Sequence, residues 1–93
     1  MSEKNIDLVK AEIKRGVERH GNYNSSHEAY AVLLEEVDEL WDEIKKRHQD
    51  YPAMKKEAIQ VAAIAIRFCD EIDEILAKPN PPAGEGEEND KSA

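Results

Sequence analysis

The chain is poor in several residue types that would widen its range of folds. Only 5% of its 93 residues are aromatic, and it contains a single cysteine, Cys69. A lone cysteine cannot form a disulfide within the chain, and its apolar neighbours favour a reduced thiol in the core. No apolar run is long enough to span a bilayer, and the N-terminal segment lacks the apolar stretch of a secretory signal. We therefore expect one small cytoplasmic domain with no membrane partner.

Basic residues are also in short supply. The chain has 13 lysine and arginine residues against 21 acidic ones, so its formal net charge is -8. No excess of positive charge is present to displace the counterions of a nucleic acid, and direct binding to a nucleic-acid polymer is not expected. The charge balance leaves open a small anionic ligand that is held through a metal ion.

Apolar residues at helical spacing mark three segments, and none of them shows the alternation of a strand. The first helix is expected over residues 3 to about 20 and ends at Gly21. The second helix opens with a capping box formed by Ser25 and Glu28 and runs to about His48. Its apolar face consists of Ala29, Leu33, Val37, Leu40 and Ile44, with Tyr30 and Trp41 at one margin.

A third helix starts near Pro52, which a first helical turn tolerates, and it continues to about Lys78, where Pro79 stops it. Residues 79–93 contain only alanine and proline as apolar side chains, so we expect a disordered acidic tail rich in proline, glycine and glutamate. The fold class is therefore expected to be all-α: a helical hairpin or bundle with three main helices over residues 1–78.

The third helix is apolar on two opposite faces. Around Glu57, within roughly 60° of it, lie Val61, Ile64, Phe68, Ile72 and Ile75. The opposite face carries Ile59, Ala62, Ile66 and Cys69. Two other helices in a chain of this size can hardly cover both faces. We therefore expect oligomerisation to complete the fold, with a symmetric homodimer as the simplest case.

Glu57 is the most informative residue, because it lies on an apolar face of the third helix. An unpaired carboxylate is costly to bury, so such a group takes up a proton, finds a hydrogen-bonded partner or binds a metal ion. An ion pair with Lys45 or Lys46 is one interpretation. A metal site shared with other carboxylates is the alternative, and both remain open at this point.

An acidic stripe on the second helix supplies such carboxylates. The stripe follows the edge of the apolar face and consists of Glu36, Glu39 and Glu43. If an antiparallel hairpin turns near residues 49–50, Glu36 and Glu39 point into the same space as Glu57. Three carboxylates so close together would repel one another unless a cation lay between them, and oxygen ligands favour Mg²⁺, with Mn²⁺ as a second choice. The competing interpretation is a solvated acidic face with local partners such as Lys46.

Two short motifs resemble those of a known family. The run Glu35-Glu36-Val37-Asp38-Glu39 matches the E-E-x-x-E motif of the MazG-like all-α nucleoside triphosphate pyrophosphatases, and Glu57-Ala58-Ile59-Gln60 lies where that family has E-x-x-D. The resemblance covers roughly residues 27–76. It implies a Mg²⁺-binding helical hairpin, assembly into dimers or dimers of dimers, and hydrolysis of a nucleoside triphosphate to the monophosphate and pyrophosphate. By position, it assigns as metal ligands Glu36, Glu39, Glu57 and Gln60, with Glu36 or Glu39 as the catalytic base.

Gln60 departs from the family pattern. Its carbonyl oxygen is able to ligate Mg²⁺, but it brings no charge. Two functions are therefore carried forward: a pyrophosphohydrolase whose metal site is weakened, and a non-catalytic oligomeric helical module that serves interaction or nucleotide binding. Basic residues near the hairpin turn are interpreted as helix caps rather than phosphate ligands; they are Lys45, Lys46, Arg47, Lys55 and Lys56.

Overall fold

The computed structural model describes residues 2–78 and confirms the expected all-α class. Three helices follow one another along this part of the chain: α1 (Glu3–His20), α2 (Ser26–Ile44) and α3 (Tyr51–Ala77). No strand occurs among the described residues. The tail expected over residues 79–93 lies outside them.

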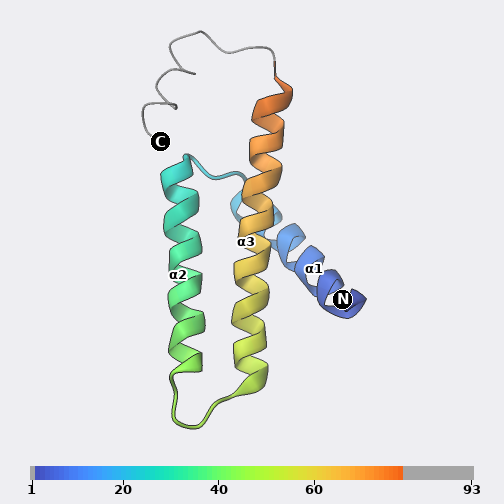
Figure 1. The fold of residues 1–93 in the computed structure, drawn as a ribbon. Helices are drawn as coiled ribbons and strands as arrows, with labels where there is room; N and C mark the ends of the chain where they lie inside the picture. Colours follow the sequence, from blue (N-terminus) through green and yellow to red (C-terminus); the bar gives the residue numbers. More distant parts are fainter. Residues whose placement is uncertain (1, 79–93) are drawn as a thin grey trace.

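The helices α2 and α3 lie side by side as an antiparallel hairpin, and α1 crosses α3 at a steep angle (Figure 1). The long α3 packs against both of the other helices. It is therefore the central element of the domain. Residues on one side of α3 face α2, and residues on another side face α1.

Each helix begins at a side-chain cap. The hydroxyl of Ser25 accepts a hydrogen bond from the Glu28 backbone N–H at 3.1 Å, and the carboxylate of Asp50 accepts one from Ala53 N–H at 3.1 Å. In a capping box, the Glu28 side chain would accept a hydrogen bond from the backbone N–H of Ser25, but here its donor is Asn24. Glu28 accepts hydrogen bonds from the backbone and side-chain nitrogens of Asn24, at 2.8 and 3.0 Å. These bonds satisfy amide groups at the start of a helix that would otherwise lack partners.

The expected end of the second helix was wrong by one turn, because α2 ends at Ile44 and not near His48. The side-chain amide of Gln49 donates a hydrogen bond to the Ile44 carbonyl at 2.7 Å, which caps the last turn. Just before this point, Glu43 forms an ion pair with Lys46 at 2.8 Å. Glu43 therefore has the local partner that a solvated acidic face predicts, and it stands apart from the other two glutamates of its stripe.

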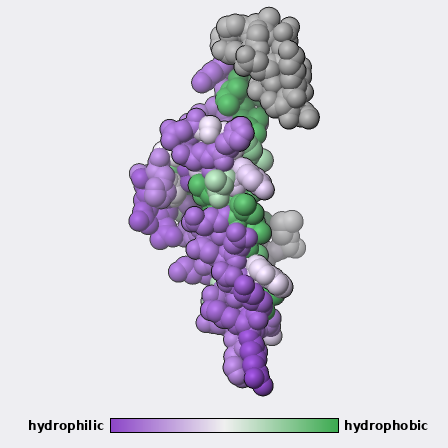
Figure 2. Space-filling model, turned by 90° about the vertical axis from the view of Figure 1, so that its left-hand side faces the viewer, coloured by the Kyte–Doolittle hydropathy of each residue, from purple (hydrophilic) through white to green (hydrophobic). Residues whose placement is uncertain are grey.

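The hydrophobic core of the single chain is small. Among the described residues, the buried hydrophobic side chains are Ala29, Ala63 and Ile64. Val37, expected on the packed face of α2, is 41% exposed. Large side chains that follow one another at intervals of one turn along α2 form an exposed surface that we call the α2 apolar stripe: Tyr30, Leu34, Val37 and Trp41. The space-filling view shows hydrophobic residues reaching the surface beside a larger hydrophilic area (Figure 2).

The second apolar face of α3 is covered only in part. Ile59 and Ala62 are half-buried and border cavities whose other walls come from α1. Ile66 is 43% exposed, and Cys69 is exposed as well. Within the single chain Cys69 is therefore not a core thiol, because no helix of residues 2–78 covers this face of α3.

Candidate metal centre

A cluster of carboxylates lies on α2, and its member Glu36 interacts with Glu57 of α3. Ligand oxygens of Glu35, Glu36 and Glu39 all lie within 4.8 Å of one another. Of these residues, Glu36 is half-buried, whereas Glu35 and Glu39 are exposed. Hard divalent cations take oxygen ligands of this type, so the cluster is able to hold a metal ion. Sequence reasoning proposed Glu36 and Glu39 but left out Glu35.

Glu36 is the centre of the cluster in electrostatic terms. Burial raises its pKa first, and the neighbouring carboxyls of Glu39 and Glu57 raise it further, to about 8. A carboxyl group with this pKa holds a proton at neutral pH when no cation is near. The same environment would favour a divalent cation, because the cation replaces the proton and neutralises the surrounding negative charge.

The carboxylate of Glu57, on α3, interacts with Glu36 across the hairpin. Glu57 does not belong to the group of three residues on α2 whose oxygens lie close together. One of its oxygens, Oε2, is buried, and no donor among the described residues reaches it. Glu57 forms no ion pair within residues 2–78, since Lys45 pairs with Asp42 and Lys46 with Glu43. The alternative of a lysine partner is therefore absent from this structure, and a buried oxygen is left for a proton or a cation.

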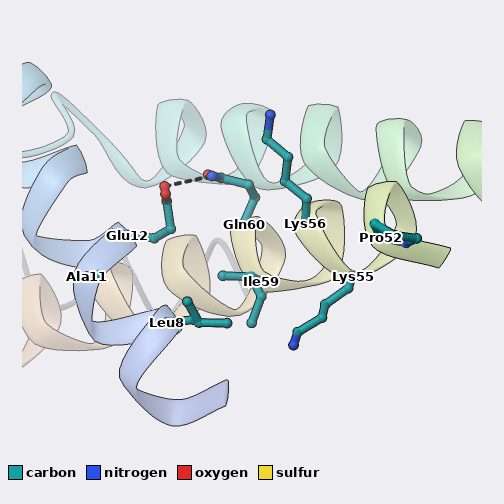
Figure 3. A pocket seen from close by; sticks show the side chains of 8 residues that line it. All are labelled: Leu8, Ala11, Glu12, Pro52, Lys55, Lys56, Ile59 and Gln60. Atoms are coloured by element: carbon teal, nitrogen blue, oxygen red, sulfur yellow. Dashed lines mark hydrogen bonds between the residues drawn. The ribbon is translucent and has the colours of Figure 1, made fainter. Parts of the chain in front are cut away.

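Gln60 turns toward α1. Its side-chain amide nitrogen donates a hydrogen bond of 2.6 Å to Oε2 of Glu12, and the two side chains point at each other across the space between α3 and α1 (Figure 3). Glu12 is also paired with Arg15 at 2.8 Å. Although burial raises the pKa of Glu12, the hydrogen bonds from Arg15 and Gln60 leave it below its ordinary value. The side-chain nitrogen of Gln60 is thus hydrogen-bonded to Glu12, and its side-chain carbonyl oxygen remains available to a cation.

Of the clustered carboxylates, Glu36 borders a cavity of about 180 Å³ in which all three helices take part. Glu36 and Gln60 line it from the hairpin, and Glu12 lines it from α1. Basic side chains complete the wall: Arg15, Arg19, His20 and Arg67. A second cavity of about 400 Å³ shares His20, Val32 and Arg67 with it, so the two adjoin. Acidic and basic groups therefore face one partly open cavity.

Sequence reasoning missed Glu12 and Arg67. Both acquire their positions from the packing of α1 on α3, and no pattern within a single helix reveals that register. One signal was present. Gly16 stands in the middle of a helix, where glycine is unfavourable, and such a residue often marks the close approach of another group.

Comparisons of the chain with known protein families, with curated proteins and with solved structures found no match. None of the helices in residues 2–78 is both long and apolar enough to cross a membrane.

Proposed function

We propose that the chain is a Mg²⁺-dependent nucleoside triphosphate pyrophosphohydrolase, as its resemblance to the MazG-like family implies. The observation that carries this proposal is the carboxyl of Glu36, held against Glu39 and Glu57 between two helices. Such an arrangement costs free energy in the absence of a cation. Structural ion clusters also perturb pKa values, but a strongly shifted carboxyl beside a cavity is typical of functional sites.

In the proposed reaction, water attacks a phosphorus atom of the triphosphate, and the bond that links the monophosphate to the departing pyrophosphate breaks. Mg²⁺, or Mn²⁺ in its place, would neutralise the phosphate oxygens and lower the pKa of the attacking water. Glu36, Glu39 and Glu57 would hold the metal, and Glu35 lies close enough to join them. The proton of the attacking water passes to Glu36 or Glu39.

The uncharged Gln60 makes this a weaker metal site than one with four carboxylates. Its hydrogen bond to Glu12 supports a different role, in which Gln60 fixes α1 against the site and its carbonyl oxygen completes the coordination. Cation affinity falls as the number of charged ligands decreases. We therefore expect activity to require higher metal concentrations than a four-carboxylate site would need.

An activity screen tests the proposal directly. The full chain is incubated with ribonucleoside and deoxyribonucleoside triphosphates, with Mg²⁺ or Mn²⁺, and pyrophosphate release is measured. Glu36→Gln should abolish release, whereas Asp38→Asn, which alters an exposed carboxylate outside the cluster on the same helix, should leave it unchanged. Release that is absent for every nucleotide, or that survives Glu36→Gln, would defeat the proposal.

The α2 apolar stripe favours a second candidate, a non-catalytic helical interaction module. Tyr30 and Trp41 are 64% and 56% exposed, and Leu34 and Val37 lie between them. Exposed apolar patches of this kind mark interaction sites. A module of this type needs no cation, so addition of Mg²⁺ should leave its melting temperature unchanged. A ligand that binds only the folded protein would raise that temperature.

Self-association is compatible with both candidates, and we propose that a second copy of the chain covers the α2 apolar stripe. Few large side chains are buried among residues 2–78, and a copy with the same stripe is self-complementary across a two-fold axis. A homodimer, or a dimer of dimers, would supply the apolar burial that the monomer lacks.

A further inference from the structure

Arg67 is the most deeply buried charged residue that the structure describes. Its side chain lies on α3, and the residue is only 6% exposed. No carboxylate in residues 2–78 forms an ion pair with it, and its Nε atom is buried without a hydrogen-bond partner. Buried charges in folded proteins are almost always paired, because an unpaired one loses its hydration with nothing in return.

The contacts that Arg67 does make fix its position but leave its charge unbalanced. Its Nη2 donates a hydrogen bond of 2.6 Å to the carbonyl oxygen of Gly21, and the guanidinium lies 4.5 Å from the centre of the Tyr23 ring. Gly21 has a φ of 67°, which suits glycine in the turn after α1. A carbonyl dipole and a ring face attract the cation, yet neither carries a negative charge.

Gly16 makes this placement possible. A Cβ atom on Gly16 would lie 2.9 Å from Nη1 of Arg67, so the absence of a side chain lets α1 approach the guanidinium closely. The approach closes one side of the cavity between α1 and the hairpin. Arg67 therefore lies in a wall of that cavity and has little room to swing into solvent.

Other basic groups line the same cavity. Arg15, Arg19 and His20 reach it from the second half of α1, and Glu36 lines it from α2. Arg15 is held by Glu12 but is 55% exposed, so its guanidinium is free to turn toward a ligand. A guanidinium presents several donors in one plane, which suits the oxygens of a phosphate group.

We propose that this cavity binds the phosphate chain of a phosphorylated ligand, with Arg67 as its buried anchor and Arg19 at its exposed mouth. The proposal rests on the proposed function for the identity of that ligand as a nucleoside triphosphate. It adds that α1, which lies outside the motif-bearing hairpin, supplies part of the substrate site. The phosphates would lie between the guanidinium groups and Glu36, the one proposed metal ligand among the carboxylates that line this cavity.

Titration calorimetry with inorganic pyrophosphate, in the presence of a chelator, tests the site without metal. Arg67→Met should weaken binding by about 10- to 100-fold, the range expected when a hydrogen bond to a charged group is lost. Its melting temperature without ligand should hold or rise, because an apolar side chain carries no unpaired buried charge. Arg47→Gln alters an exposed arginine at the hairpin turn, away from this cavity, and should bind as the wild type does.

Arg19→Gln keeps the test decisive if Arg67→Met fails to fold, because Arg19 is exposed and its loss leaves the core unchanged. It should weaken pyrophosphate binding about fivefold, as expected for one exposed charge-assisted contact. If Arg67→Met folds, pyrophosphate affinity equal to that of the wild type would overturn the proposal. If Arg67→Met is unfolded, pyrophosphate affinity of Arg19→Gln equal to that of the wild type would overturn it. A loss of pyrophosphate affinity in Arg47→Gln as large as that in the cavity variants would also overturn it.

The outcome is separable from that of the proposed function. If no triphosphate is hydrolysed but pyrophosphate binds in an Arg67-dependent manner, the pyrophosphohydrolase proposal fails and the phosphate site stands. If hydrolysis occurs and Arg67→Met leaves both KM and pyrophosphate affinity unchanged, the phosphate site fails and the catalytic proposal stands.

Discussion

Replacement of Glu36 by glutamine should make the metal-free protein more stable at about pH 8 and change little at about pH 5. In the folded chain, the pKa of Glu36 is raised from 4.5 to about 8, first by burial and then by Glu39 and Glu57. Between these two values the folded state binds more protons than the unfolded state. The free energy of unfolding therefore falls as the pH rises through this window.

The size of the effect follows from the shift. A difference of about 3.5 pH units corresponds to at most about 5 kcal/mol at alkaline pH. Glu36 is only half-buried, and water screens its repulsion with Glu39 and Glu57, so we expect about 2 kcal/mol. Glu36→Gln resembles the protonated carboxyl in shape and hydrogen bonding, and it never ionises. The variant should therefore keep at pH 8 the stability that it has at pH 5.

Urea unfolding of the wild type and Glu36→Gln across this pH range, with a chelator present, measures the difference. Glu74→Gln is the matched control, because Glu74 is an exposed carboxylate near the far end of α3. Parallel pH dependence in the wild type and Glu36→Gln would refute the reasoning. With Mg²⁺ added at about pH 8, the wild type should gain stability and Glu36→Gln should not, since ligand binding to the folded state alone raises its stability.

Two further substitutions separate the remaining interpretations. Glu57→Gln should lower the Mg²⁺ affinity by at least about tenfold, because it removes a charged ligand, and Mg²⁺ should then stabilise the variant less than the wild type. Its stability without metal should be equal or higher, because repulsion with Glu36 is relieved. A loss of about 3 kcal/mol in thermal melts, with or without metal, would instead indicate a buried cationic partner. Trp41→Ser should shift a dimer or higher oligomer toward monomer in light scattering at micromolar concentration, with little change in the fold, because Trp41 is 56% exposed in the single chain; a wild-type chain that is already monomeric would contradict the assembly proposal.

The helices and their caps could be predicted because their causes are local. Ser25 caps the amide of a residue three positions away, and the periodicity of apolar residues marks each helix without reference to the rest of the chain. The end of α2 was misplaced because a side chain beyond the helix, Gln49, closes it early. A cap from outside the helix leaves no pattern in the helix itself.

The candidate site was predicted in its hairpin part and missed in its α1 part, for a physical reason. Antiparallel packing of neighbouring helices fixes which levels meet, so Glu36, Glu39 and Glu57 could be expected to point into a common space by counting along the chain. The crossing of α1 over α3 has no such constraint. The contacts of Glu12 and Arg67 depend on its angle and register, and these follow from side-chain packing over the whole interface.

Exposure was the least predictable property. Val37 and Cys69 both belong to apolar faces by periodicity, and both are exposed in the single chain. Periodicity reports that a face is apolar but not what covers it. The same exposure supports a partner surface, because a face with regular apolar spacing and no cover within residues 2–78 is available to a second copy.

Gln60 illustrates how α1 changes the interpretation of the metal site. A carboxylate in place of Gln60 would face Glu12 where a hydrogen bond of 2.6 Å now forms, and two acidic groups would then repel each other. We expect Gln60→Asp to lower metal-free stability by about 1.5–3 kcal/mol, since it also removes a hydrogen bond to a charged group. Mg²⁺ should restore more stability to this variant than to the wild type, because the site gains a fourth carboxylate. Combining it with Glu12→Gln should recover the metal-free loss while keeping the gain in Mg²⁺ response. Thermal melts of the single and double variants, with and without Mg²⁺, measure both effects, and a Mg²⁺ response no larger than that of the wild type would place the cation elsewhere.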